Sequence, residues 1–222
     1  MNELVFITQA VLVAGASLTA LRMGKSALIA FISGLTIFAN LFVIKQISLC
    51  GMDATATDAY TIGGFFGLNL LREYYGASST KQAIGINFFM LFLFGIVAHL
   101  HLLYLPTPFD QTHQAYCTIL DHAPRIIFAS MITYVVAQLF NTALYGFFKR
   151  ISKNRFYLLR NYASVAISEL ADTLLFSFLG LYGIVHNIVD IIMISYSIKL
   201  LVALLGTPLL VLSKYIKKGP SD

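Results

Sequence analysis

Charged side chains in the middle of apolar runs are the residues of this sequence best placed to do chemistry. The run "NYASVAISELADTLLFSF" carries Asp172 near its centre and Glu169 three residues earlier, on the same face of a helix. The run "SYSIKLL" carries Lys199 at the midpoint of another apolar segment. If these runs cross a bilayer, an unpaired charge at this depth costs about 2.5–3.5 kcal/mol on insertion scales. The sequence therefore predicts that Lys199 pairs with Asp172 or Glu169.

Polar side chains also recur at three- and four-residue steps in four of the apolar runs, so each run presents one polar face. A single Ser, Thr or Tyr on such a face most simply hydrogen-bonds a neighbouring helix, whereas full charges at membrane depth favour a functional role. The predicted substrate-binding residues are Asn40, Lys45, Asn69, Glu73, Tyr134, Gln138, Asn141, Asn161, Ser164, Ser168, Glu169, Asp172 and Lys199.

A site of amides, hydroxyls and carboxylates suits a flat heterocycle, because a carboxylate accepts two N–H bonds from a purine-like edge. Tyr134 or Phe176 is a candidate to stack on the face of the ring. An ion filter would instead use rings of carbonyls or charges of one sign. No HExxH, GxSxG or P-loop motif and no metal-ligand spacing occurs, so no catalytic residue, metal or cofactor is predicted and the chain is not expected to be an enzyme.

Composition shows where these polar faces lie. The chain of 222 residues is 58% hydrophobic and 11% charged, with a mean hydropathy of +0.79, which indicates an all-α polytopic membrane protein. Its net charge of +5 arises from basic residues at the ends of apolar runs, so nucleic acid is not an expected partner. Seven membrane spans are predicted, at 4–21, 26–48, 57–73, 84–105, 126–148, 162–185 and 188–212.

The connections between these spans predict an orientation. Every second connection is rich in Lys and Arg, which places the N-terminus outside and the C-terminus inside. The first span has no basic leader or cleavage site and is expected to stay in the fold. In the third span Gly63 and Gly67 predict close helix packing, in a helix that is whole or broken, and the loop at 105–124 is expected to be a cap without a helix. Whether Cys50 and Cys117 pair is left open.

Five segments in order resemble a known family, the queuosine-precursor transporters, also called the vitamin-uptake-transporter-like family. These segments are "ANLFVIKQI", "GLNLLREYYG", "PRIIFASMITYVVAQLFN", "RNYASVAISELADTLLF" and "YSIKLLVALLGTPLLVL". The resemblance implies a six-helix carrier in the bacterial inner membrane for 7-deazaguanines, the precursors of the modified tRNA base queuosine. It places the family core at 26–215 and an extra helix at 4–21, within one membrane domain at 1–222.

The chain departs from the family pattern at three positions of the predicted site. Asn69 and Asn141 stand where the family often has aspartate, and Glu169 stands where an amide is usual. Queuine and the aminomethyl precursor preQ1 carry a cationic amine, whereas the nitrile precursor preQ0 does not. The resemblance therefore implies a 7-deazaguanine substrate and leaves open which one is preferred.

The expected function is uptake of a queuosine precursor from the outside for salvage into tRNA modification. The partners expected are a small-molecule substrate and the lipid bilayer, while a homo-oligomer and a coupling ion such as a proton are left open. One alternative is a substrate-binding membrane subunit for vitamin-like compounds that needs a separate energising module. A membrane-embedded enzyme is a weaker alternative that rests only on the pair Glu169 and Asp172.

Overall fold

The computed structural model describes residues 1–151 and 157–216, with side-chain positions outside 142, 145, 149, 157–161 and 205–216. The described chain is mostly helical. Its elements are α1 (Asn2–Met23), α2 (Lys25–Phe42), β1 (Gln46–Leu49), β2 (Met52–Thr55), α3 (Asp58–Leu102), α4 (His113–Leu120), α5 (Ala123–Ile151), α6 (Tyr157–Phe176), the π-helical segment η1 (Ser177–Leu181) and α7 (Ile188–Ile216).

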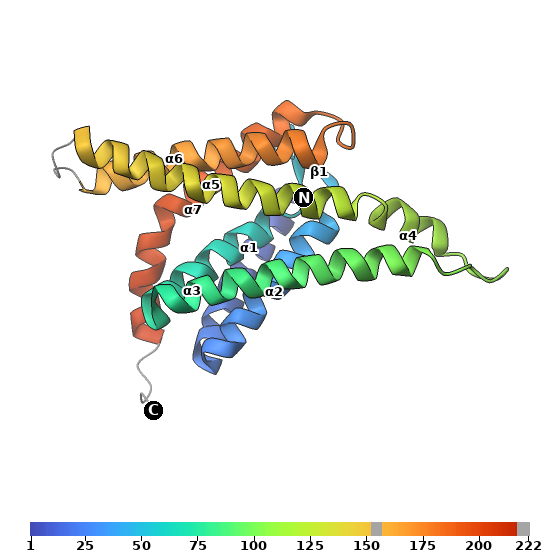
Figure 1. Ribbon diagram of the computed structural model, residues 1–222, viewed down its shortest axis with the longest axis horizontal. Helices are drawn as coiled ribbons and strands as arrows, with labels where there is room; N and C mark the ends of the chain where they lie inside the picture. Colours follow the sequence, from blue (N-terminus) through green and yellow to red (C-terminus); the bar gives the residue numbers. More distant parts are fainter. Residues whose placement is uncertain (152–156, 217–222) are drawn as a thin grey trace.

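The long helices pack side by side, with α5 and α6 as an antiparallel pair along one side and α1 and α2 against α3 on the other (Figure 1). The best-packed part of the interior lies between α1, α2 and the first half of α3, where Leu21, Leu28, Phe66, Leu70 and Leu71 are almost fully buried. Transfer of one such side chain out of water stabilises a fold by about 1.5–3 kcal/mol. Within a bilayer the surroundings are already apolar, so close packing provides the stabilisation instead.

Two glycines of α3 bring its neighbours close. A side chain at Gly63 would overlap Val13 of α1 and approach Leu35 of α2, and one at Gly67 would meet Ile32 at 2.8 Å. The close packing predicted from their spacing is confirmed. The third predicted span is a continuous helix as far as Gly76, where φ is 80° and ψ is 173°, a conformation open almost only to glycine. The chain reverses there without a loop, so α3 contains the third and fourth predicted spans.

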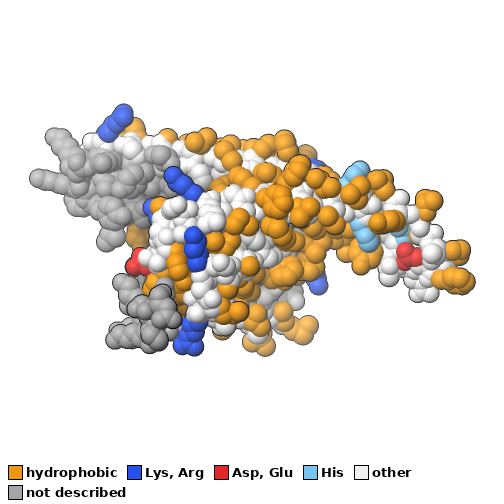
Figure 2. All heavy atoms as spheres, turned by 60° about the horizontal axis from the view of Figure 1, so that its bottom comes forward, with side chains coloured by type: hydrophobic (Ala, Val, Ile, Leu, Met, Phe, Trp, Pro, Cys, Tyr) orange, Lys and Arg blue, Asp and Glu red, His pale blue; other side chains and the backbone are white. Residues whose placement is uncertain are grey.

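The outer faces of the helices are apolar. Phe89, Phe92, Leu100, Leu139 and Phe178 are all more than half exposed. In Figure 2 such side chains cover most of the visible face, while Lys and Arg side chains gather mainly toward the end where α3 reverses. Five helical segments of the described residues are long and apolar enough to cross a bilayer: Asn2–Met23, Lys25–Phe42, Asp58–Leu102, His113–Phe148 and Tyr162–Leu181. The chain is a multi-pass membrane protein.

The fold is mostly helical, as the all-α prediction expects, but a β hairpin between α2 and α3 corrects the predicted end of the second span. The second span was predicted to reach residue 48, but α2 ends at Phe42 and β1 pairs with β2 in the antiparallel register Gln46↔Thr55. Cys50 and Gly51 make the turn, with φ of 52° and 81°, as two-residue hairpin turns require. Both Cys50 and Cys117 are free thiols.

The loop at 105–124 was expected to lack helix and instead contains α4, which makes the second correction. Leu120 of α4 is buried against Leu91, Ala98 and Ile127. This apolar contact explains a helix as short as eight residues, since tertiary packing stabilises a helix that would be marginal in isolation.

Candidate functional site

A cavity of about 280 Å³ lies between α2, α3, α5, α6 and α7, with the end of the hairpin beside it. Its volume is close to the lower limit of about 300 Å³ for small-ligand sites, which suits a compact molecule. The charged groups among its described lining residues are Asp58, Glu169, Asp172 and Lys199, and its amides are Asn40, Asn87 and Gln138. Polar groups from five helices therefore converge on one space.

An ion-pair cluster of α6 and α7 forms one wall of the cavity. Lys199 Nζ donates a hydrogen bond to Asp172 Oδ2, and it lies 3.5 Å from Glu169 Oε2. The side chains of Lys199, Glu169 and Asp172 are only 11%, 17% and 24% exposed. The predicted pairing of Lys199 with these carboxylates is confirmed. The geometry also shows that two carboxylates share one ammonium group.

Within this cluster, one carboxylate oxygen of Glu169 accepts no hydrogen bond from the described residues. Its Oε2 is buried and, among the described residues, lies within ion-pair distance of Lys199 Nζ but makes no hydrogen bond. An oxygen of this kind usually has a partner in a folded protein, since burial without one costs about 1–3 kcal/mol. A ligand with N–H donors would supply that partner.

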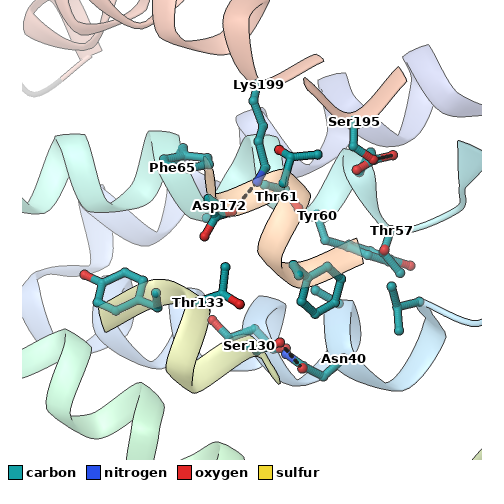
Figure 3. Close-up of a pocket in the computed structure, with 18 of the residues that line it drawn as sticks. Asn40, Thr57, Tyr60, Thr61, Phe65, Ser130, Thr133, Asp172, Ser195 and Lys199 are labelled. Carbon is teal, nitrogen blue, oxygen red and sulfur yellow. Dashed lines mark hydrogen bonds and ion pairs between the residues drawn. The ribbon is translucent and has the colours of Figure 1, made fainter. Parts of the chain in front are cut away.

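The opposite wall carries neutral polar groups. Ser130 Oγ donates to Asn40 Oδ1 at 2.7 Å, and Asn40 Nδ2 donates to the carbonyl of Thr36 at 2.9 Å. Figure 3 shows this pair facing Lys199 and Asp172 across the cavity, with Thr133 between them. Thr133 is 1% exposed and its Oγ1 has no hydrogen-bond partner among the described residues. Thr133 is thus a second buried polar group that a ligand could satisfy.

Aromatic rings line the remaining faces. Tyr134 meets Phe88 edge to face, with ring centroids 5.4 Å apart and an interplanar angle of 90°. Tyr60, Phe65 and Phe176 also line the cavity. Aromatic faces beside polar groups match the needs of a flat heterocycle, which stacks on a ring while its edge forms hydrogen bonds.

Asp58 is a charged site residue that the sequence interpretation missed. It stands at the start of the third predicted span, where it was not assigned to the site, but it is 6% exposed at the first position of α3 and lines the cavity. Its Oδ2 accepts hydrogen bonds from Ser195 Oγ at 3.0 Å and Thr55 Oγ1 at 3.3 Å. The step of four residues from Ser195 to Lys199 places both on one face of α7, but this spacing does not identify Asp58 as the partner of Ser195.

Three predicted site residues are exposed and do not line the cavity. Lys45 lies between α2 and β1, where only its backbone bonds are described, and Asn69 and Glu73 lie on an exposed face of α3. The cavity-facing positions of α3 end at Leu68 in the first half of the helix. Asn69 follows Leu68 and is turned by about 100° from it.

Three further predicted residues, Ser164, Ser168 and Asn141, are not among the described residues that line the cavity. Ser164 and Ser168 are buried within α6, and Ser168 Oγ donates to the carbonyl of Ser164 at 2.7 Å. Asn141 is half-buried, with an Oδ1 that has no partner among the described residues, and the side chain of Asn161 lies outside the described residues. Tyr134, Gln138 and Asn40 do line the cavity as predicted.

Hydrogen bonds join the hairpin to the connection between η1 and α7 near one end of the site. The backbone N–H of His186 donates to Gln46 Oε1 at 2.8 Å, and His186 Nδ1 lies 3.3 Å from Asp53 Oδ2. The backbone N–H of Asp53 in turn donates to Asp190 Oδ2 at 3.2 Å. At the same end Arg125 donates to the carbonyls of Leu179 and Tyr182, each at 2.8 Å, which ties α5 to η1 and the residue after it.

Comparison with known proteins agrees with this architecture. A family model described as putative vitamin uptake transporter matches residues 59–213. The chain is 32% identical over 203 residues to the probable queuosine precursor transporter of Bacillus subtilis (strain 168), which covers 90% of this chain and 87% of that protein. No solved structure matches the chain. The resemblance inferred from the five segments is confirmed, and the chain belongs to the putative vitamin uptake transporter family.

Proposed function

We propose that this protein transports a queuosine precursor, a 7-deazaguanine, across the cytoplasmic membrane through the cavity between α2, α3, α5, α6 and α7. The observation that carries the proposal is that two buried polar atoms of the cavity, Glu169 Oε2 and Thr133 Oγ1, make no hydrogen bond among the described residues and lie in a cavity lined by aromatic rings. A relative named for queuosine-precursor transport supports the substrate class.

The chemistry of the cavity complements a guanine-type edge. Such an edge presents two adjacent N–H donors and one carbonyl acceptor. Glu169 offers a carboxylate oxygen to the donors, and Lys199 offers N–H groups to the carbonyl. The amide of Gln138 is a further polar group on the cavity lining. Stacking on Tyr134 or Phe176 orients the ring plane. Hydrogen-bonded recognition of this kind rejects a base that lacks the donors, because the buried acceptors would then be left unpaired.

The orientation proposed from the charge pattern puts the hairpin and α4 outside and the reversal of α3 inside. The gathering of Lys and Arg side chains toward that reversal supports it (Figure 2). In this arrangement seven spans cross the bacterial inner membrane, and α1 is the helix added before a core of six. The cavity would then be closed from the outside by the contacts of Gln46, Asp53 and His186.

Flux through the purified chain tests the proposal. Reconstituted alone into liposomes, it is expected to accumulate labelled preQ0, preQ1 or queuine in a saturable manner, and each precursor should compete with the others while adenine does not. Saturable binding without flux would instead support the alternative of a capture subunit that needs an energising module. Absence of both binding and flux for all three compounds would refute the proposal.

A proton is the proposed coupling ion, with Glu169 or Asp172 as its carrier. The support is that two carboxylates share Lys199, so one of them can take up a proton without leaving the lysine unpaired. Uptake should follow an imposed inward proton gradient in the same liposomes. Uptake that is unchanged after a protonophore collapses the gradient would contradict this assignment.

A further inference from the structure

Asp58 is a buried carboxylate at the end of the cavity beside the hairpin. It is 6% exposed and its Oδ2 accepts from the hydroxyls of Thr55 and Ser195. Among the described residues no Lys, Arg or His lies within ion-pair distance of it, and Lys199 acts on it only at longer range. Hydroxyl groups satisfy the oxygen's hydrogen-bonding capacity but supply no positive charge, and a buried carboxylate is stabilised most by a cation in direct contact.

The described lining of the cavity has more acidic than basic groups. It contains three carboxyl groups, on Asp58, Glu169 and Asp172, and one ammonium group, on Lys199. Lys199 hydrogen-bonds Asp172 and lies 3.5 Å from Glu169, so it is committed to the cluster on α6. A cation bound at Asp58 would offset the excess of negative charge.

One face of α7 contacts both acidic centres. Ser195 hydrogen-bonds Asp58 and Lys199 hydrogen-bonds Asp172, and the two residues of α7 are one helical turn apart. Figure 3 shows Ser195 and Lys199 descending from the same side of the cavity toward different ends of it. The cavity that both centres line is the space in which a small bicyclic base would bind. If its donor edge meets Glu169, the substituent on its five-membered ring points away from that edge, toward Asp58.

We propose that Asp58 binds the cationic amino group on the side arm of the substrate, so that this transporter selects aminomethyl-type 7-deazaguanines over the uncharged nitrile. The inference rests on the proposed function and adds the preferred substrate class. A primary alkylamine is protonated at neutral pH, and its three N–H donors include one for a carboxylate. The nitrile of preQ0 has neither charge nor donor. Thr57, next to Asp58 on the cavity wall, has a hydroxyl that can accept a second N–H of the amine.

Substitution Asp58→Asn tests the assignment, because the amide keeps an oxygen for Ser195 and Thr55 but removes the charge. Uptake of preQ1 and preQ0 is measured in cells and liposomes that contain equal amounts of folded protein. We expect affinity for preQ1 to fall about tenfold or more, as for loss of a charge-assisted hydrogen bond, while affinity for preQ0 changes by less than about twofold. The control Asp121→Asn makes the same chemical change at an exposed position after α4 and should alter neither.

A measurement on the unchanged protein keeps the proposal testable if Asp58→Asn does not fold. Competition of labelled preQ0 binding by preQ1 and by its N-acetylated form should favour preQ1 by about tenfold, since acetylation removes the charge. Equal potency of the two competitors would overturn the assignment, as would equal loss of preQ1 and preQ0 uptake in folded Asp58→Asn. Failure of the proposed function gives a different result, in which the wild-type protein binds neither precursor.

Discussion

Ser195 and Lys199 lie one turn apart on α7, and each contacts a carboxylate from a different helix: Asp58 of α3 and Asp172 of α6. α7 therefore links the two acidic centres of the cavity. A displacement of this helix relative to α3 and α6 would break both contacts together, whereas a change in α6 alone would affect only the lysine cluster. This arrangement makes the side chains of α7 informative positions for substitution.

Removal of the lysine should be the most damaging single change in the cavity. Lys199→Met leaves Asp172 and Glu169 beside each other without a cation, and breaking a buried ion pair typically costs about 3–5 kcal/mol. We expect a lower unfolding temperature in detergent and loss of uptake. Lys81→Met, on the exposed surface of α3, should change neither. Wild-type uptake by folded Lys199→Met would show that the pair is not needed for transport.

Neutralising the partner should recover part of that stability. The double substitution Lys199→Met with Asp172→Asn removes the unpaired charge that the single substitution leaves. Thermal unfolding of the four proteins of this cycle gives the coupling between the two sites. A double variant no more stable than Lys199→Met would mean that repulsion between Asp172 and Glu169 is not the cause of the loss.

Substitution of Glu169 should weaken substrate binding without lowering the stability of the protein. Glu169→Gln removes one of two carboxylates that share Lys199, so the unfolding temperature should stay the same or rise. The substrate would lose a charged acceptor, worth about 1.5–3 kcal/mol or roughly 10–100-fold in affinity. Calorimetric titration of the purified protein with a 7-deazaguanine measures this. Unchanged affinity would remove Glu169 from the recognition site.

Close packing around α3 should make Gly63 intolerant of a side chain. Gly63→Ala overlaps Val13 and approaches Leu35 at 2.9 Å, and such overpacking costs about 1–3 kcal/mol. Gly85→Ala is the matched control in the second half of the same helix, because nothing lies within 4 Å of its new methyl group. The unfolding temperature should fall for the first variant and hold or rise slightly for the second. Equal behaviour of the two would contradict the close approach of α1 and α3.

The hairpin should have to move during transport if it closes the outer end of the cavity. Cysteines at positions 46 and 186, in a chain with Cys50→Ser and Cys117→Ser, would place two thiols where Gln46 and His186 now touch. A short, reducible thiol cross-linker should stop uptake, and a reductant should restore it. Full uptake by the cross-linked protein would show that access to the cavity lies elsewhere.

The sequence predicted the parts of the site that depend on membrane energetics. Lys199, Glu169 and Asp172 were found because charges at mid-membrane depth must pair, and this constraint identifies partners without a structure. The same argument does not identify Asp58, because this residue stands at the start of an apolar run, where a charged side chain is expected to face water. Its burial includes the contact with Ser195 of α7, a long-range contact that no local pattern reports.

Other errors have different physical causes. Helical spacing correctly grouped Asn69 with Glu73, but a period shows which residues share a face and not which neighbour that face meets. The first strand of the hairpin was included in the second predicted span because the segment up to residue 48 is apolar enough to continue it. Its strand pairing depends on the turn at Cys50 and Gly51 and on contacts with α7, which no local pattern reports.

The π-helical segment η1 forms the end of one cavity wall. Ser177 and Leu181 of η1 line the cavity beyond Asp172 and Phe176 of α6, so the wall continues through a turn with π-helical backbone spacing. The carbonyls of Leu179 and Tyr182, in and just after this turn, accept hydrogen bonds from Arg125 of α5. Because a π turn holds one residue more than an α turn, deletion of a single residue here would restore α-helical spacing and shift these carbonyls relative to Arg125, without altering any residue of the acidic centres.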